Sequence, residues 1–256
     1  MGRIIAVANQ KGGVGKTTTT VNLSSCLAEK GKKVLTIDID PQGNTTRAFG
    51  IDKRKLKNTI YELLLGQVSS KKAIIKNIFK NISLIPADVD LAGAEIELID
   101  VEENSFILKK HIDEIRDKYD YIIIDCPPSL STLTVNALTT ADTVLVPIQC
   151  EFFALEGLSQ LMYTINLVKK RLNPNLEIEG VVFTMYDSRT NLSMQVVDEV
   201  KKALKRTNIY KTIVPRNVRL GEAPSHGLPI NIYDTNSKGA ESYRLLADEV
   251  INREDE

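Results

Sequence analysis

A glycine-rich loop with two lysines lies near the start of the chain, between a short apolar run and a run with helical character. The apolar run, Arg3 to Ala8, predicts a strand, and the run Lys16 to Lys30 predicts a helix. Glycines let backbone amides turn toward a phosphate, and a helix N-terminus adds positive potential at the same place. The sequence therefore predicts a phosphate-binding loop. Its members are Lys11, Gly12, Gly13, Val14, Gly15, Lys16, Thr17 and Thr18.

This loop is a variant of the usual phosphate-binding pattern. Gln10 stands where that pattern has its first glycine, and Lys11 is an additional lysine inside the loop. Lys16 holds the usual lysine position, from which its ammonium would contact the terminal phosphates of a nucleotide. Thr17 would ligate Mg²⁺ through its hydroxyl. The expected ligands of the loop are therefore a nucleotide and Mg²⁺.

Two aspartates stand at and just beyond the end of the next predicted strand, Lys33 to Asp38. Asp38 and Asp40 are two residues apart, and alternation along a strand would place both carboxylates on one side, facing the phosphates. One such carboxylate can hold a water molecule for attack on the γ-phosphate, and we predict Asp40 for that role. The alternative is that Asp40 only starts a turn before Pro41.

A third aspartate ends an apolar run. The run Tyr121 to Asp125 predicts a strand with Asp125 at its carboxyl end, the form of a Walker B motif that reaches Mg²⁺ through water. Cys126 follows, but a lone cysteine without a nearby histidine is expected to be a small buried hydrophobe. We assign metal binding to Asp125 and no chemistry to Cys126.

Strand-like and helix-like runs alternate along the rest of the chain. Further strands are predicted at Ile82 to Pro86, Thr143 to Pro147, Ile178 to Thr184 and Ile209 to Val214, and further helices at Leu130 to Thr139, Leu155 to Leu172, Leu192 to Arg206 and Gly239 to Asn252. This order predicts an α/β P-loop fold, a mostly parallel twisted sheet flanked by helices on both faces. Gly31 should end the first helix, and a small helical excursion is expected within residues 50–81. Residues 1–256 are predicted to form one domain, because no linker or repeat divides them.

Composition and charge limit the classes of protein that the chain can be. The formal net charge is +0, with 43% hydrophobic and 26% charged residues, which is a globular balance with no overall attraction to a polyanion. The N-terminus lacks a secretory signal pattern, and no apolar run approaches the roughly 20 residues of a membrane span. The cysteines Cys26, Cys126 and Cys150 form no CxxC pair, which disfavours a disulfide framework. We expect a cytoplasmic protein.

Taken together, these motifs resemble the ParA/Soj family of chromosome and plasmid partition ATPases, within the deviant Walker A group. The resemblance covers nearly the whole chain. Four blocks carry it, namely Lys11 to Thr17, Asp38 to Asn44, Asp125 to Pro128 and Val214 to Leu220. The combination of these blocks is more specific than any one of them.

The resemblance implies that the chain binds ATP and Mg²⁺, hydrolyses ATP to ADP and phosphate, and forms a homodimer when ATP is bound. It implies that Lys11 reaches across this dimer to the phosphates of the other subunit, and that Gly12 lies where the subunits approach closely. Pro215 and Asn217 match family positions beside the adenine. Without the resemblance, this stretch would be interpreted as the end of a strand and a loop.

The resemblance also implies that the ATP-bound dimer binds double-stranded DNA without sequence preference and is associated with the nucleoid. Arg189 and Arg219 match family positions implicated in this binding. From residue 169 to 219, basic residues outnumber acidic ones about two to one, which suits contacts with phosphates. The basic residues are Lys169, Lys170, Arg171, Arg189, Lys201, Lys202, Lys205, Arg206, Lys211, Arg216 and Arg219. For those within residues 201–206, a solvated helix face is the alternative.

The implied partner is a ParB-like protein bound at the centromere, which would stimulate slow hydrolysis. Because no helix-turn-helix precedes the loop, we do not expect repression of an operator. Two other functions are alternatives. A membrane switch of the MinD type would need an amphipathic C-terminal helix, whereas residues 247–256 are acidic and poor in apolar side chains, so we expect no membrane partner. A cluster carrier like the nitrogenase iron protein would need paired cysteines, for which Cys126 and Cys150 are weak candidates.

Overall fold

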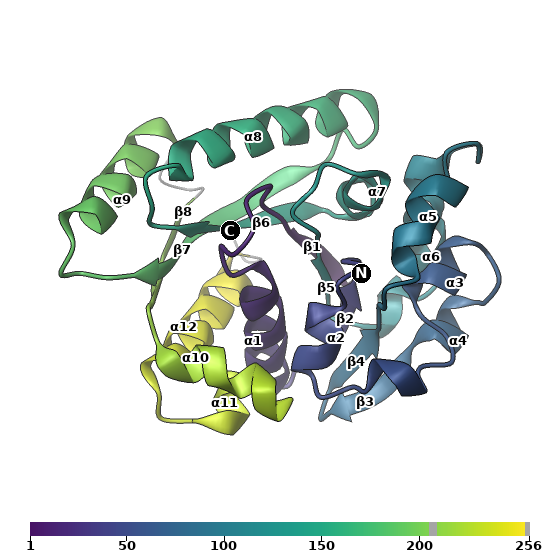
Figure 1. Ribbon diagram of the computed structural model, residues 1–256, viewed down its shortest axis with the longest axis horizontal. Coiled ribbons are helices and arrows are strands. Elements are labelled where there is room, and N and C mark those ends of the chain that lie inside the picture. The colour runs from purple at the N-terminus through teal and green to yellow at the C-terminus, as the bar shows by residue number, and fades with distance from the viewer. Residues whose placement is uncertain (205–208, 254–256) are drawn as a thin grey trace.

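The residues that the structure describes form an eight-stranded sheet, with helices on both of its faces (Figure 1). The structure, a computed structural model, describes residues 1–204 and 209–253. In spatial order the strands are β3 (Ile75–Phe79), β4 (Ile82–Ile85), β2 (Val34–Asp38), β5 (Tyr121–Asp125), β1 (Arg3–Val7), β6 (Thr143–Gln149), β7 (Glu177–Tyr186) and β8 (Ile209–Pro215). Neighbouring strands are parallel except β3 and β4, which are antiparallel. The predicted α/β fold with a mostly parallel sheet is confirmed.

The helices bury the two faces of this sheet. They are α1 (Lys16–Glu29), α2 (Asn44–Ala48), α3 (Ile60–Leu64), α4 (Ser70–Ala73), α5 (Leu91–Glu97), α6 (Ile107–Asp113), α7 (Thr132–Thr140), α8 (Ala154–Arg171), α9 (Asn191–Ala203), α10 (Val218–Glu222), α11 (Ile230–Tyr233) and α12 (Lys238–Asn252). One apolar core contains residues of α1, α2 and α10 to α12, and the other contains residues of α3 to α9. Figure 1 shows α8 and α9 along one face and α1 and α12 on the other. Among the described residues, no helix combines the length and apolar composition needed to cross a membrane.

The central strands are apolar on both sides because helices cover both sides. Every residue of β2 and β5 is buried, so neither strand alternates between apolar and polar residues. β1 lies between β5 and β6, and the chain continues from β1 through α1 to the β2 side of the sheet. In such sheets, ligands bind beyond the carboxyl ends of the strands, where the strand order reverses. The loop after β1 lies at this point.

The predicted strands and helices are present, with small shifts at their ends. α1 begins at Lys16 as predicted, and Gly31 follows its end with φ 86°, the left-handed conformation expected of a residue that terminates a helix. The helix predicted from Leu192 to Arg206 corresponds to α9. Its last two predicted residues, Lys205 and Arg206, lie outside the described residues.

The stretch of residues 50–81 contains the predicted helical excursion, as α3 and α4, and also a strand that the sequence did not predict. This strand is β3, the outermost strand of the sheet beside β4, and its register with β4 is interrupted between Ile75 and Phe79. Asn77 and Asn81 have positive φ values of 53° and 64°. These polar interruptions hide the alternation by which an edge strand is usually recognised.

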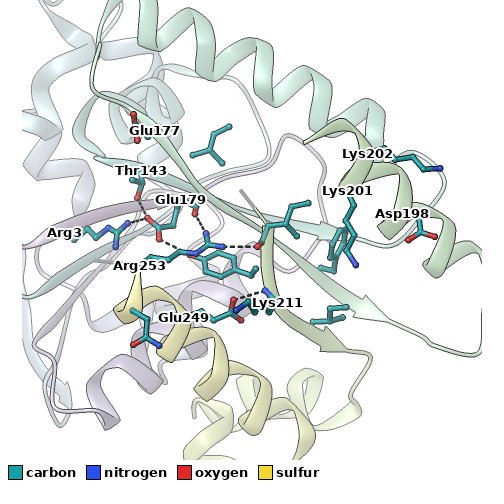
Figure 2. Close-up of a pocket in the computed structure, with 16 residues that line it drawn as sticks. Arg3, Thr143, Glu177, Glu179, Asp198, Lys201, Lys202, Lys211, Glu249 and Arg253 are labelled. Atoms are coloured by element: carbon teal, nitrogen blue, oxygen red, sulfur yellow. Dashed lines mark hydrogen bonds and ion pairs between the residues drawn. The ribbon is translucent and has the colours of Figure 1, made fainter. Parts of the chain in front are cut away.

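A buried carboxylate on β7 is bonded to side chains of three other strands, near the amino ends of the parallel strands, which form the edge of the sheet opposite the glycine-rich loop (Figure 2). Glu179, on β7, accepts hydrogen bonds from Arg3 Nη2 at 2.6 Å, Thr143 Oγ1 at 2.6 Å and the Tyr210 hydroxyl at 3.0 Å. Arg253, just after α12, donates to the Glu179 carbonyl and lies 3.9 Å above the centre of the Tyr210 ring. This cluster fixes the end of α12 to the sheet.

We predict that Glu179→Gln lowers the free energy of unfolding by about 2 kcal/mol. The amide can still accept a hydrogen bond, but it leaves the Arg3 guanidinium without its counter-charge. The loss is smaller than for a fully buried pair because 21% of the Arg3 side chain is exposed. Urea denaturation measures it, with the exposed Glu177→Gln on the same strand as the matched control. Equal stability of the two variants would contradict a structural role for this carboxylate.

Candidate active site

The glycine-rich loop has a backbone that glycine is needed to adopt. Gly13 and Gly15 have φ values of 76° and 89°, in the left-handed region that side chains disfavour. Thr184, on β7, donates from Oγ1 to the Val14 carbonyl at 2.8 Å and packs on Gly15. A Cβ atom at Gly12 would meet no described atom within 4 Å, so the loop faces open space at that position. The loop is therefore anchored on one side and accessible on the other.

Lys16 lies inside this loop and is almost fully buried. Its Nζ donates to the Lys11 carbonyl oxygen at 3.1 Å, which spans the loop. Burial lowers the pKa of Lys16, and the nearby Asp125 carboxylate opposes that effect. A buried ammonium bonded to a neutral carbonyl is well placed to gain an anionic partner, so its surroundings fit a phosphate.

The predicted metal ligands lie in direct contact. Thr17 Oγ1 donates to Asp125 Oδ2 at 2.7 Å, which brings the start of α1 to the end of β5. Thr45, on α2, donates to the same oxygen at 2.7 Å, and Thr20 donates to Oδ1 at 3.3 Å. Burial raises the pKa of Asp125. A hydroxyl beside a carboxylate at the base of the loop is a donor set that fits Mg²⁺.

Asp38 is fully buried at the end of β2, and its predicted position on one side with Asp40, facing the phosphates, stays a prediction. β2 ends at Asp38, and beyond it the chain turns, so alternation no longer applies. Both oxygens of Asp38 are engaged: Oδ2 accepts from the amide and hydroxyl of Thr46 at 2.8 and 2.7 Å, and Oδ1 accepts from the Asp40 amide at 3.3 Å. Asp38 lies beside Asp125 in the register of β2 and β5. Burial, reinforced by the Asp125 charge, raises the pKa of Asp38.

Asp40 occupies the turn that follows β2. Its Oδ1 accepts from the Gln42 amide at 2.9 Å, and its carbonyl accepts from the Gly43 amide at 2.8 Å, so the turn role considered as an alternative is present. Within the described part of the chain, Oδ2 has no hydrogen-bond donor. Asp40 is close enough to Lys16 and Asp125 to influence their pKa values. It thus has a carboxylate oxygen available near the loop.

Lys11 is held by a carboxylate that sequence reasoning missed. Its Nζ lies 2.9 Å from Glu151 Oε2, and its amide donates to the Asn9 side chain at 3.0 Å. Glu151 follows β6, and Phe152 and Phe153 beside it form a T-shaped pair with ring centroids 5.1 Å apart. Both rings are largely exposed, Phe152 at 78%. Because Lys11 and Glu151 are 140 residues apart, only the neighbouring positions of β1 and β6 bring them together.

The two predicted adenine contacts do not line the groove beside the loop. That groove is lined by Thr17 and Thr18 together with residues of α2 and of the 3-10 helix Ala223–His226. Pro215 ends β8, and Asn217 caps α10 by accepting from the Leu220 amide at 3.3 Å. The roles of Pro215 and Asn217 stay predictions.

Arg189 and Arg219, the predicted DNA contacts, lie at the same edge of the sheet as the loop. Arg189 follows β7 and Arg219 follows β8, and these strands end side by side at Tyr186 and Pro215. Arg189 makes a two-point contact with Asp187, at 2.9 and 2.7 Å, which lowers the pKa of that carboxyl. Arg189 is therefore exposed but already paired with a carboxylate.

The partners of Arg219 come from two elements. Its Nη1 lies 2.8 Å from Glu222 Oε2 and its Nε lies 3.4 Å from Asp234 Oδ2. Lys201 and Lys202, in contrast, lie toward the opposite edge, where they line a cavity with Arg3 and Thr143 (Figure 2). The basic residues predicted from the sequence are thus divided between two edges of the sheet.

A lysine-bearing glycine loop between β1 and α1, with its threonine hydroxyl on the aspartate that ends β5, defines a P-loop ATPase of the deviant Walker A type. Comparisons with known proteins agree. A family model described as an AAA domain matches residues 2–178. Soj of Bacillus subtilis, a sporulation initiation inhibitor protein, is 56% identical over 98% of each chain. Chromosome partitioning protein ParA of Myxococcus xanthus is 50% identical over 99% of this chain and 89% of its own.

Solved structures show the same fold. Cobyrinic acid a,c-diamide synthase from Mycobacterium smegmatis, with bound ADP and magnesium, has a TM-score of 0.88 and 38% identity, over 100% of this chain and 96% of its own. Cell division ATPase MinD from Pyrococcus furiosus has a TM-score of 0.80 and 28% identity, over 99% and 100%. The chain belongs to the Soj/ParA family of chromosome-partitioning ATPases.

The two cysteines considered for the cluster-carrier alternative lie inside the protein. Cys126 and Cys150 are both buried, and burial raises the pKa of the Cys150 thiol to about 11. No group of three metal-ligating side chains occurs among the described residues. The expectation that Cys126 is a small buried side chain is confirmed, as it is 1% exposed.

We predict that Asp38→Asn makes the stability of the nucleotide-free protein less dependent on pH. The folded-state pKa of Asp38 is raised, so the unfolded chain releases its proton at lower pH, and stability falls as the pH rises toward the folded pKa. The asparagine variant has no proton to release at this position, so its stability should not fall in this way. Relative to wild type, its free energy of unfolding should therefore rise between pH 5 and pH 8, on the order of 1 kcal/mol. Urea midpoints at the two pH values measure the difference. A gap between the proteins that stays constant with pH would contradict the shift.

Proposed function

We propose that this chain is an ATP-switched partition protein. ATP with Mg²⁺ drives formation of a homodimer, the dimer binds double-stranded DNA without sequence preference on the nucleoid, and a ParB-like centromere-binding protein stimulates hydrolysis. The observation that carries the proposal is that one edge of the sheet holds the phosphate loop, Lys11 and both candidate DNA contacts, Arg189 and Arg219. A nucleotide bound at this edge can therefore influence all of them.

Several features of the loop mouth support a dimer formed through bound ATP. The Lys11 side chain is partly exposed and makes a surface ion pair with Glu151, which contributes little to stability and can be exchanged for a phosphate. Gly12 leaves open space above the loop. Phe152 and Phe153 expose aromatic surface beside the same ion pair, as interface cores commonly do. A second subunit approaching this edge would bury the aromatic pair and meet Lys11.

The residues around the loop support hydrolysis of the γ-phosphate. Lys16 would bind the terminal phosphates, and the free Oδ2 of Asp40 would accept a hydrogen bond from the attacking water and orient it. Thr17, and Asp125 through water, would hold Mg²⁺, which when bound neutralises phosphate charge. Lys11 of the other subunit would add a second positive charge at the same phosphates.

The positions of the arginines support DNA binding that depends on the dimer. A single pair of exposed cations gives weak attraction to DNA, whereas two subunits related by symmetry present four. Arg189 is 85% exposed, and its pairing with Asp187 is a surface interaction that a phosphate can replace. The relatives that are 56% and 50% identical are Soj and ParA proteins, and the second is named for chromosome partitioning. Cobyrinic acid a,c-diamide synthase is less similar in sequence, at 38% identity, so the comparisons favour partition over amide synthesis.

We predict that Asp40→Asn lowers ATP hydrolysis by about 100-fold or more while nucleotide binding persists. The substitution keeps the turn, because the amide oxygen can still accept from the Gln42 amide, but it removes the charge that orients water. Phosphate release measures hydrolysis, and a fluorescent ATP analogue measures binding. Asp113→Asn, at an exposed site on α6, is the control. Wild-type hydrolysis by Asp40→Asn would leave only the turn role for this residue.

We predict that Arg189→Ala and Arg219→Ala each weaken binding of a random-sequence DNA duplex in the presence of ATP. Each removes a phosphate contact, so each should reduce the slope of log affinity against log salt by about 1. Fluorescence anisotropy at several salt concentrations measures both quantities, with ATP, with ADP and without nucleotide. Binding that is equal in all three states would contradict the nucleotide switch.

Two further variants make this test specific to the proposed edge. Lys201→Ala removes an exposed cation at the opposite edge of the sheet and should leave DNA affinity unchanged within about twofold. Asp187→Asn frees Arg189 from its carboxylate and should increase DNA affinity. A larger loss of DNA affinity with Lys201→Ala than with Arg189→Ala would contradict DNA binding at the edge that holds Arg189 and Arg219.

A further inference from the structure

Helix α5 is apolar on two faces, and only one of them is covered by the protein. Leu91, Ala94 and Leu98 are buried in the core. Val89 and Ile96 are 72% and 74% exposed, and Ala92 and Ile99 are exposed as well. Ala92 and Ile96 lie four residues apart on α5 and share its exposed side, and Val89 and Ile99 add exposed apolar side chains in the turns just before and after the helix, so the four make one short solvent-facing stripe. We call this stripe, with the acidic residues around it, the α5 surface.

The α5 surface is strongly acidic. Residues 88–103 contain seven acidic residues and no lysine, arginine or histidine, in a chain with 33 basic and 33 acidic residues in total. The acids are Asp88, Asp90, Glu95, Glu97, Asp100, Glu102 and Glu103. Glu103 pairs with Lys110, and Glu97 accepts from the Tyr61 hydroxyl. In the described part of the chain, Asp90, Glu95, Asp100 and Glu102 have no cationic partner.

The charge of this surface decides which occupant it fits. DNA and anionic lipid headgroups would both be repelled by the carboxylates. Pairing of α5 with α5 of a second copy would place like charges opposite each other, because a two-fold interface brings the same patch from both subunits together. A basic segment with apolar side chains at helical spacing would match both the carboxylates and the aliphatic stripe.

We propose that the α5 surface is a docking site for a basic amphipathic segment of a partner protein. The aliphatic stripe supplies the buried contact, and the surrounding carboxylates select lysine and arginine on the partner and raise its rate of encounter. α5 lies on the opposite side of the molecule from α9 and α10 (Figure 1). Binding there would leave Arg189 and Arg219 free, so a partner and DNA can be bound at once.

The test uses the full chain without nucleotide and a short fluorescein-labelled peptide of leucine and lysine at helical spacing. The double variant Ile96→Ser with Asp100→Lys alters an exposed aliphatic and an exposed acid four residues apart. We expect it to weaken binding of this peptide by about tenfold or more, measured by fluorescence anisotropy. A peptide with glutamate in place of lysine should not bind.

The matched control is Leu245→Ser with Glu241→Lys, an exposed aliphatic and acid at the same separation on α12. It should bind the lysine peptide like wild type, and both double variants should unfold at the wild-type midpoint because the altered side chains are exposed. Equal loss in both variants, or equal binding of the glutamate peptide, would overturn the proposal. So would self-association of the wild-type chain that Ile96→Ser with Asp100→Lys abolishes, because a second copy would then cover the surface.

Discussion

Two carboxylates, Asp38 and Asp125, are buried side by side where β2 and β5 end, and the arrangement of the nucleotide edge depends on how they are satisfied. Thr17 on α1 and Thr45 on α2 donate to Asp125, and Thr46 on α2 donates to Asp38. An unpaired buried carboxylate is costly, so these hydroxyls fix both helices against the sheet. The start of α1, and with it the phosphate loop, is therefore held in place before any nucleotide binds.

The rim of the same edge is built differently. Lys11, Arg189 and Arg219 each make ion pairs at the surface, where such pairs contribute little and exchange readily. A phosphate can replace the carboxylate in each of these exposed pairs, because an ammonium or a guanidinium binds either anion through charge-assisted hydrogen bonds. A fixed base with an exchangeable rim suits a protein that changes its partners with its nucleotide while the fold stays unchanged.

Motifs tied to local structure could be predicted from the sequence, whereas long-range pairings could not. The loop at Lys16 and the strand ending at Asp125 follow from glycine spacing and a continuous apolar run. The pairing of Lys11 with Glu151 depends on which strands are neighbours, and no local signal encodes it. Alternation could not fix the relative orientation of Asp38 and Asp40, because β2 ends at Asp38 and the chain turns beyond it. The outer stripe of α5 and the edge strand β3 were missed, because short elements with polar interruptions give weak periodicity.

The central claim is that ATP, through Lys11, joins two copies of the chain at this edge. Sedimentation velocity of Asp40→Asn protein, in which hydrolysis should be blocked, tests it directly with ATP, with ADP and without nucleotide, beside the same protein carrying Lys11→Ala. A dimer with ATP only, and a monomer throughout once Lys11 is replaced, is the predicted result. A monomer in every state, or a dimer that forms with ADP or without Lys11, would contradict the account.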